Sequence, residues 1–214
     1  MTELILLGGG GHARSVLAAL RAQGRVVRGH LAPEPGSVGE GCPHLGDDEV
    51  LGTLNPDEVT FVVALGSTAS TRARQALYER AVATGFRAEQ VLHPRAFIDP
   101  SARLGEGAQV LAGAIVNAGA VIGDNALVNS GAIIEHDVVI GAHAHVSPGA
   151  ALAGGVHIAD GAHVGLGARV IQSINVGSGS VIGAGAVVIE DVPAHTVVVG
   201  VPARATGSVK KGQA

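Results

Sequence analysis

The chain has 214 residues, of which 33 are glycine and only 2% are aromatic, and its formal net charge at pH 7 is −4. This charge gives no reason to expect a surface for nucleic acids or anionic membranes. A single cysteine, Cys42, excludes an internal disulfide, and no apolar run reaches the length that spans a bilayer, so we expect a soluble cytoplasmic protein.

The first ninety residues alternate between patterns of buried strands and patterns of helices. Residues 4–7 predict a buried strand, 13–23 a helix that ends before a glycine, and 25–30 a second strand. Residues 61–65 predict another buried strand, and 71–83 predict the helix after it. Because strands and helices alternate, we expect a small α/β domain with a parallel sheet whose binding edge lies at the carboxyl ends of the strands.

A turn of four glycines joins the first predicted strand to the first predicted helix. Free backbone N–H groups and the helix dipole favour a phosphate or a carboxylate at such a turn. Gly8, Gly10 and Ala13 nearly match a dinucleotide-binding pattern, but Ala32 and Pro33 stand where its acidic residue is expected. Together with the second half of the chain, the turn favours a nucleotide-sugar diphosphate over a redox dinucleotide. A tight turn that binds nothing is the alternative.

From residue 98 to residue 193 a six-residue pattern repeats sixteen times without a change of register. Each repeat begins with a branched aliphatic residue, and three residues later there is a glycine in ten of the sixteen repeats. A period of six predicts a solenoid, in which short strands end at turns with positive φ and three strands make one triangular coil. Residues eighteen apart then lie above one another. The aliphatic positions are Ile98, Leu104, Val110, Val116, Ile122, Val128, Ile134, Ile140, Val146, Leu152, Ile158, Val164, Val170, Val176, Ile182 and Val188.

The repeat resembles that of the hexapeptide-repeat acyltransferases, and the resemblance implies a left-handed parallel β-helix. The pattern breaks near His93 and Pro94, which predicts two domains. We expect a Rossmann-like nucleotide-sugar-binding domain over residues 1–92, the β-helix over 93–206 and a flexible tail over 207–214.

Three features together narrow this resemblance: the four glycines followed by His12, the hexapeptide repeats, and the closing segment from Gly200 to Arg204. They resemble the bacterial sugar acetyltransferases of the sialic-acid O-acetyltransferase type, which include N-acetyltransferases of nucleotide-linked 4-amino sugars. The resemblance covers nearly the whole chain. It implies a homotrimer that uses acetyl-CoA, bound between adjacent β-helices, to acetylate an amino group of a nucleotide-activated 4-amino-6-deoxy sugar for surface glycan biosynthesis. Acetylation of a sugar hydroxyl at the same site is the alternative.

His136 lies two residues after the inward Ile134, so we expect it at a corner of a coil, facing outward. Acetyl transfer needs a base that takes a proton from the attacking amine, and histidine suits this task near neutral pH. The resemblance makes His136 this base and Asp137 the carboxylate that orients it, with Glu135 as a local competitor. A direct attack without an acyl-enzyme is expected. From spacing alone, a solvated turn residue is the alternative.

His145 follows His136 by half a coil, so the two should lie on different sides of the prism, and a site that contains both needs two subunits. Gly154 follows His136 by a full coil, where its N–H could stabilise the thioester oxygen. Arg204 is a candidate contact of a coenzyme phosphate or a solvent-facing residue. The resemblance implies coenzyme contacts at His145, Gly154, Leu166 and Ala184.

For the substrate, the resemblance implies a sugar or amine contact at His12, which could instead cap its own helix. The pair Ala32 and Pro33 departs from relatives that carry paired acidic residues there, so the nucleotide is not transferred from the resemblance. The expected substrate residues are Gly10, Gly11, His12, Gly66 and Ser67.

Two other classes of protein remain open at this point. One is a zinc lyase of the carbonic-anhydrase kind, with ligands among His136, His143, His145 and His163, although the first domain has no part in it and no metal is expected. The other is a non-catalytic nucleotide-sugar-binding protein. His145 and His163 are eighteen residues apart and should stack, which is also compatible with a plain surface ladder.

Overall fold

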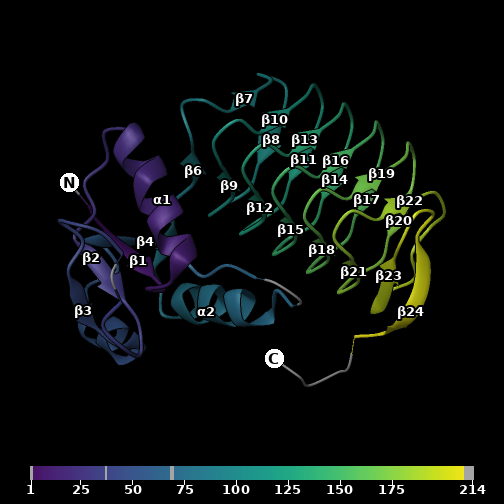
Figure 1. The fold of residues 1–214 in the computed structure, drawn as a ribbon. Coiled ribbons are helices and arrows are strands. Elements are labelled where there is room, and N and C mark those ends of the chain that lie inside the picture. The colour runs from purple at the N-terminus through teal and green to yellow at the C-terminus, as the bar shows by residue number, and fades with distance from the viewer. Residues whose placement is uncertain (1, 37, 68–69, 210–214) are drawn as a thin grey trace.

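The structure is a computed structural model that describes residues 2–36, 38–67 and 70–209 (Figure 1). Its amino-terminal part is a five-stranded sheet in the order β3-β2-β1-β4-β5, in which all strands are parallel. The predicted parallel sheet is therefore confirmed. Its elements are β1 (Glu3–Leu7), α1 (Gly11–Ala22), β2 (Gly29–Leu31), β3 (His44–Gly46), the 3-10 helix η1 (Asp48–Thr53), β4 (Val59–Val63), α2 (Arg72–Ala83) and β5 (Arg87–Ala88).

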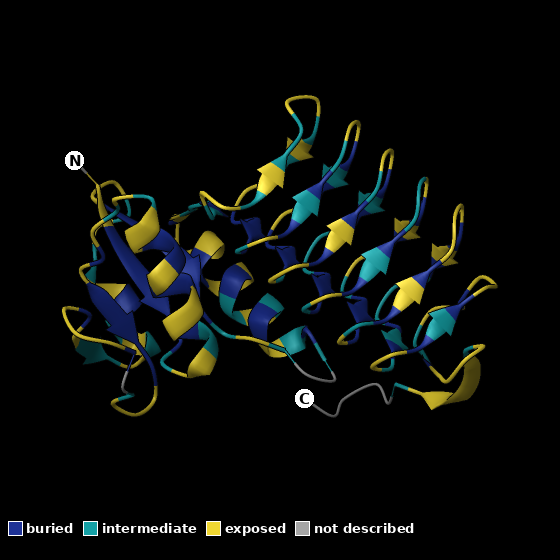
Figure 2. Cartoon of the chain, turned by 45° about the horizontal axis from the view of Figure 1, so that its top comes forward, coloured by how far each residue is buried: buried dark blue, intermediate teal, exposed yellow. Residues whose placement is uncertain are grey.

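The two central strands, β1 and β4, are buried on both faces because each face is covered. Leu4, Leu6 and Val62 pack against the apolar side of α1, and Ile5 and Phe61 pack on the side of α2 and η1. Figure 2 shows the strands as buried elements between helices that expose one side only. This layered arrangement leaves the carboxyl ends of β1 and β4 facing the second half of the chain.

The second strand is shorter than the sequence predicts. Strand β2 begins at Gly29, opposite Ile5, whereas residues 25–28 form no strand and Val26 is 85% exposed. The apolar pair Val26 and Val27 suggested a buried strand, but only Val27 turns into the core. The segment between α1 and Gly29 is a connection, and this part of the prediction is wrong.

The second half of the chain is a left-handed parallel β-helix with three parallel sheets, one on each side. Each of the sixteen predicted aliphatic residues is the second residue of a two-residue strand, and the strands from β7 to β19 each pair with the strand eighteen residues on. The strands are β6 (Val91–Leu92), β7 (Phe97–Ile98), β8 (Arg103–Leu104), β9 (Gln109–Val110), β10 (Ile115–Val116), β11 (Val121–Ile122), β12 (Leu127–Val128), β13 (Ile133–Ile134), β14 (Val139–Ile140), β15 (His145–Val146), β16 (Ala151–Leu152), β17 (His157–Ile158), β18 (His163–Val164), β19 (Arg169–Val170), β20 (Asn175–Val176), β21 (Val181–Ile182), β22 (Val187–Val188), β23 (Thr196–Val199) and β24 (Arg204–Ser208).

The corners of the coils have the backbone conformation that the glycine pattern predicts. All ten glycines that follow an aliphatic residue by three positions have φ between 61° and 71°. Asn125, Asp137, His143 and Ser173 occupy the same position in other repeats, with φ between 52° and 60°. Positive φ is uncommon for residues with a side chain, and a short polar side chain tolerates it best. The predicted catalytic aspartate thus stands at a conformationally demanding corner.

The amino-terminal domain packs on one sheet of the solenoid, the one that contains β6, β9, β12, β15, β18 and β21. The Arg74 side chain is 1% exposed and connects the two halves: its guanidinium donates to the carbonyl oxygens of Val63 (2.8 Å), Leu65 (3.1 Å) and Asn125 (3.3 Å). Burial lowers the pKa of Arg74 to about 9, so the group stays charged at neutral pH. Gln109 Nε2 also donates to Val63 O, at 2.7 Å. These bonds hold the end of β4 against the solenoid.

The carboxyl-terminal end closes the solenoid with an antiparallel pair, β23 and β24. Residues 207 and 208, predicted as part of a flexible tail, belong to β24 because Val197 and Thr196 pair with them. Residues 210–214 of that tail lie outside the described residues. None of the helices in the described part of the chain is long and apolar enough to cross a membrane.

Candidate active site

A cavity of about 630 Å³ lies where the glycine turn, the end of β4 and the solenoid sheet meet. It is lined by all five predicted substrate residues and by three of the residues predicted to contact the coenzyme. The two sets come from opposite halves of the chain, so the packing of the domains brings them together. They are Gly10, Gly11, His12, Gly66 and Ser67 from the first domain and His145, Leu166 and Ala184 from the second.

The wall of this cavity that the solenoid supplies includes three members, His145, His163 and Val181, of a ladder of outward residues spaced by eighteen. The rings of His145 and His163 stack with centroids 4.9 Å apart and an interplanar angle of 18°, which confirms the predicted stacking. Both side chains are 4% exposed. The surface-ladder interpretation is therefore wrong, because the amino-terminal domain covers this sheet. The ladder consists of Gln109, Leu127, His145, His163 and Val181.

His145 is held as a neutral ring by one partner from each domain. Asn129 Nδ2 lies 3.2 Å from Nε2 and donates to it, so the ring proton is on Nδ1 and is donated to Ser67 Oγ at 2.6 Å. Burial, with the nearby His163 and Arg74, lowers the pKa of His145 to about 2. A histidine this resistant to protonation is a poor base at neutral pH.

His12 lies in the first turn of α1, and its ring bonds across to the solenoid rather than capping its own helix. Nε2 lies 3.2 Å from Gln109 Oε1 and donates to it, which leaves Nδ1 as an acceptor. Burial, together with the charge of Arg74, lowers the pKa of His12 to about 4. A neutral acceptor of this kind suits a hydrogen bond from a sugar hydroxyl or amine.

His163 is the least satisfied polar group of the cavity. Nε2 bonds to Ser147 Oγ at 2.8 Å, whereas Nδ1 is buried and has no hydrogen-bond partner within the part of the chain that the structure describes. Burial lowers the pKa of His163, so the ring is neutral. An unpaired buried nitrogen costs free energy, which a ligand in the cavity would offset by bonding to it.

His136 and Asp137 lie at a different place, the corner between β13 and β14. Their side chains are 65% and 75% exposed, and His136 Nδ1 donates to Asp137 Oδ2 at 3.0 Å. Asp137 has φ 58°, and its carboxylate, not that of Glu135, bonds to the histidine. The free Nε2 of His136 is then available to accept a proton, as the assigned role requires.

Gly154 lies against His136, as its spacing of one coil predicts. A Cβ on Gly154 would come within 2.5 Å of His136 Cε1 and Nε2. Among residues 2–36, 38–67 and 70–209, no hydrogen-bond acceptor binds the Gly154 N–H. The predicted site residues thus form two groups, one in the cavity and one at this corner, on different sides of the prism.

Arg204 belongs to neither group. It lies in the exposed strand β24, where Nη1 is 3.9 Å from Glu190 Oε1 and donates to Ala203 O at 2.9 Å. The structure does not bring this side chain to the cavity.

Several polar residues of the site were not singled out from the sequence. Gln109 is two coils before His145, and Asn129 and Ser147 are one coil apart, so steps of eighteen from His145 and its neighbours would have found them. Arg74 has no such signal, because its burial depends on how the two halves pack.

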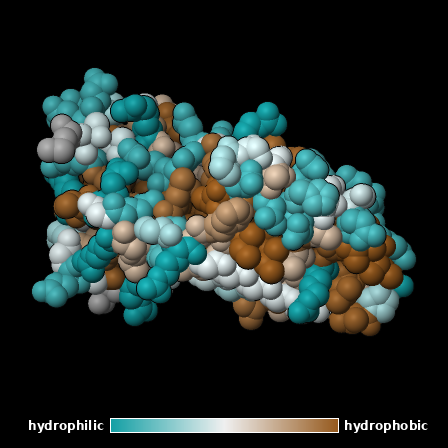
Figure 3. Space-filling view, turned by 90° about the horizontal axis from the view of Figure 1, so that it is seen from above, coloured by the Kyte–Doolittle hydropathy of each residue, from teal (hydrophilic) through white to brown (hydrophobic). Residues whose placement is uncertain are grey.

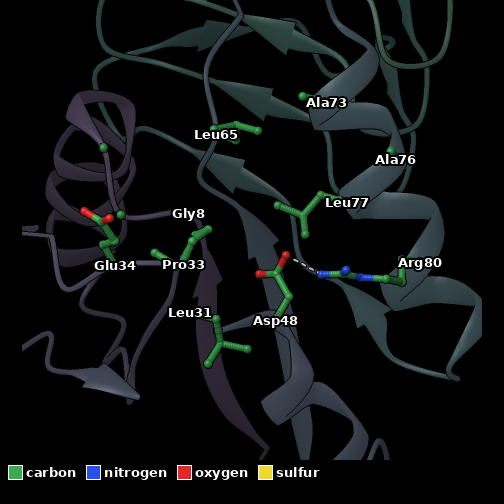
Figure 4. Close-up of a pocket in the computed structure, with 13 residues that line it drawn as sticks. Gly8, Leu31, Pro33, Glu34, Asp48, Leu65, Ala73, Ala76, Leu77 and Arg80 are labelled. Atoms are coloured by element: carbon green, nitrogen blue, oxygen red, sulfur yellow. Dashed lines mark ion pairs between the residues drawn. The ribbon is translucent and has the colours of Figure 1, made fainter. Parts of the chain in front are cut away.

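A second cavity, of about 700 Å³, lies beside the first and shares Gly10 and Leu65 with it (Figure 4). Its walls are mostly apolar and include Ala32 and Pro33, which stand where the dinucleotide-binding pattern expects an acidic residue. An ion pair between Asp48 and Arg80 lies across it. Gly10 of the glycine turn, the predicted place for a diphosphate, thus borders both cavities.

The described residues contain no group of three or more His, Cys, Asp and Glu side chains that could hold a metal ion.

Comparison with known families identifies both halves of the chain. The family of the PglD N-terminal domain matches residues 3–81, and the bacterial transferase hexapeptide family (six repeats) matches residues 119–154. A search of curated proteins returned no match.

Solved structures resemble the whole chain. The structure of PerB from Caulobacter crescentus, in complex with CoA and GDP-perosamine, is 40% identical over 97% of this chain and 98% of that chain, with a TM-score of 0.90. The acetyltransferase domain of PglB from Neisseria gonorrhoeae, in complex with acetyl coenzyme A, is 35% identical over 95% and 98%, with a TM-score of 0.89. WeeI from Acinetobacter baumannii, 24% identical over 96% and 100% with a TM-score of 0.81, shares the fold. The chain belongs to the hexapeptide-repeat sugar acetyltransferases that carry a PglD-type amino-terminal domain.

Proposed function

We propose that this protein transfers the acetyl group of acetyl-CoA to an amino group of a nucleotide-activated sugar of the 4-amino-6-deoxy type. The observation that carries the proposal is the 630 Å³ cavity, in which the glycine turn and His12 meet His145, Leu166 and Ala184. A nucleotide-binding turn and a coenzyme-binding solenoid that share one cavity suit a reaction between a nucleotide-sugar and CoA. The close relatives, whose structures contain CoA with GDP-perosamine or acetyl-CoA, support this assignment.

The nucleotide-sugar would lie across both cavities. Its diphosphate would bind the backbone N–H groups of the turn at Gly10 and Gly11, where α1 begins. Its base would occupy the 700 Å³ cavity, and its sugar would reach the 630 Å³ cavity beside His12. The neutral Nδ1 of His12 would then accept a hydrogen bond from the sugar.

The catalytic corner would come from a neighbouring subunit of a homotrimer. His136 and Gly154 lie on a different side of the prism from the cavity, so one subunit does not hold a complete site. Apolar side chains on the sheet of β7, β13, β19 and β22, or directly after its strands, favour an interface there, and Figure 3 shows hydrophobic residues over the solenoid. The exposed ones are Phe97 (54%), Ile133 (37%), Ile171 (37%) and Ile189 (39%).

The arrangement of His136, Asp137 and Gly154 at the corner supports a direct transfer of the acetyl group. The neutral amine of the sugar attacks the thioester carbon, and His136 Nε2 takes a proton from the nitrogen as the C–N bond forms. The Asp137 carboxylate, bonded to Nδ1, stabilises the imidazolium, and the free N–H of Gly154 stabilises the oxyanion. The C–S bond then breaks, and the thiolate takes the proton back from His136. The acetylated sugar would serve surface glycan biosynthesis. The enzyme would act in the cytoplasm.

The test is the release of free CoA thiol with nucleotide 4-amino sugars, with the product identified by mass. An N-acetyl product is stable to mild base, whereas an O-acetyl ester is cleaved, which separates the two acceptor types. His136→Ala is expected to lower kcat by about 10²- to 10⁴-fold, while His157→Ala, which changes an exposed histidine of strand β17, keeps wild-type kcat. Wild-type kcat in His136→Ala would remove the histidine from the mechanism. The absence of CoA release with every amino sugar would reject the activity.

A further inference from the structure

The cavity of about 700 Å³ combines mostly apolar walls with three charged side chains: Asp48 and Arg80, which form an ion pair, and Glu34, which lies away from that pair in Figure 4. In Figure 4 the carboxylate of Asp48 and the guanidinium of Arg80 point toward each other, with Leu77 and Leu31 on either side. Apolar walls suit the faces of an aromatic base, whereas polar groups between them suit its edge. The pair therefore stands where the edge of a base would be recognised.

Local structure holds the two charges in place. Asp48 begins the 3-10 helix η1, whose preceding residue Asp47 caps it by accepting from the Glu49 N–H at 3.0 Å. Arg80 lies in the last turn of α2 and bonds to Asp48 Oδ2. The other carboxylate oxygen of Asp48 has no partner among the described residues. One ion pair thus offers acceptor oxygens beside guanidinium donors.

We infer that Asp48 and Arg80 read the base of the nucleotide and select guanine. This inference rests on the proposed function, which leaves the base open. The Watson–Crick edge of guanine presents two adjacent donors, N2–H and N1–H, followed by the acceptor O6. A carboxylate accepts both donors side by side, and an adjacent guanidinium donates to O6. The carboxylate followed by the guanidinium thus matches the two donors followed by the acceptor on the edge of guanine.

The other bases fit this pair less well. The edges of uracil and thymine place a single N–H between two carbonyl oxygens, so one carbonyl would face the carboxylate. Cytosine and adenine place a ring nitrogen with a lone pair beside their amino group, which also opposes a carboxylate. A site built to bond two donors rejects bases that lack them, because its own polar groups are then left unpaired.

Isothermal titration calorimetry of the wild-type protein with GDP, inosine diphosphate, UDP and dTDP tests the inference. Inosine diphosphate lacks only the 2-amino group of GDP, so this comparison depends on no variant. GDP is expected to bind roughly 10- to 100-fold more tightly than inosine diphosphate and UDP. UDP or dTDP binding as tightly as GDP would overturn the guanine assignment and leave the proposed function standing. The absence of binding by all four nucleotides would overturn both.

A variant then assigns the preference to Asp48. In Asp48→Asn the gap between GDP and inosine diphosphate is expected to fall to within about threefold, since the amide replaces one acceptor by a donor. Glu49→Gln, an exposed neighbour that removes the same charge but does not line this cavity, should keep the gap. A gap that survives in Asp48→Asn, with the variant folded by circular dichroism, would refute the role of Asp48.

Discussion

The imidazole ring of His136 lies against Gly154, which occupies the same corner one coil further along the solenoid. A methyl group on Gly154 would overlap the ring at 2.5 Å, and the φ of this glycine lies outside the left-handed region. Gly154→Ala should therefore displace the ring without straining the backbone. We expect kcat to fall by roughly 10- to 100-fold because a displaced base loses its alignment, with little change in Tm.

The matched control is Gly52→Ala, since a Cβ at Gly52 would meet no atom within 4 Å. Steady-state kinetics and thermal melts of both variants check the prediction. An unchanged kcat in Gly154→Ala would show that the position of the His136 ring does not limit the reaction.

Replacing Asp137 by asparagine separates its charge from its backbone conformation. Asparagine also tolerates positive φ, so the corner with φ 58° should keep its shape. The amide no longer stabilises the imidazolium, so we expect kcat to fall about tenfold. The acidic limb of the kcat–pH profile, where the base becomes protonated, should move to lower pH. If only Tm changed while the pH profile stayed the same, Asp137 would be a structural corner residue.

Two inactive variants should restore activity to each other if the site needs two subunits. His136→Ala removes the base, and Leu166→Arg places a large charged side chain in the cavity, where Leu166 is 59% exposed. In randomly mixed trimers, a site is intact when the subunit that supplies the corner carries His136 and the subunit that supplies the cavity carries Leu166. Each condition is met by half of the subunits, which gives about a quarter of wild-type activity. Subunits are mixed by co-refolding and assayed for CoA release.

Unmixed variants, refolded in the same way, measure the background. Activity of the mixture no greater than this background, in verified mixed trimers, would indicate that each subunit holds a complete site.

Acid should destabilise the fold through the buried neutral histidines. The pKa of His145 is lowered to about 2, so between pH 6.5 and 2 the unfolded chain binds a proton there that the folded chain does not. The free energy of unfolding therefore falls as the pH falls, by about 2 kcal/mol at pH 5 from this residue. At pH 7.5 the contribution is absent.

Denaturant unfolding at pH 7.5 and pH 5.0, at one protein concentration, measures this difference. His145→Gln should show a smaller loss than the wild type, by about 2 kcal/mol, and the exposed His157→Gln should match the wild type. An equal loss in all three proteins would contradict the low pKa of His145.

Neighbouring residues on one strand test the stacked core. Ile140 points inward and is 1% exposed, whereas Val139 points outward on the same strand, β14. Ile140→Ala is expected to lower the free energy of unfolding by about 2–5 kcal/mol, because a cavity remains in a close-packed interior. Val139→Ala should cost less than about 1 kcal/mol. Equal effects in urea titrations would mean that the inward ladder does not dominate stability.

The period of six residues predicts much of the carboxyl-terminal half because its consequences are local and repeat without a change of register. It places Gly154 beside His136 and His163 beside His145 from arithmetic alone. It also puts His136 and His145 on different sides, since half a coil separates them. These relations need no knowledge of the first domain.

What the sequence does not predict depends on how the two domains pack. Whether His145 and His163 are exposed or buried is decided by which sheet the first domain covers. Asp48 and Arg80 are more than thirty residues apart in the sequence and belong to two different elements, without a repeat to align them. The prediction of a strand over residues 25–28 is wrong because a short apolar run does not reveal which of its side chains will be covered.

The buried guanidinium of Arg74 has a consequence for the cavity between the two domains. Carbonyl oxygens from the end of β4 and from a solenoid corner accept its hydrogen bonds, and a buried cation that lost them would be left uncompensated. Moving the two domains apart would break these bonds, so the width of the cavity between them is set when the chain folds. The outward ladder, with steps of about 4.8 Å per coil, therefore presents its side chains to the cavity at fixed intervals.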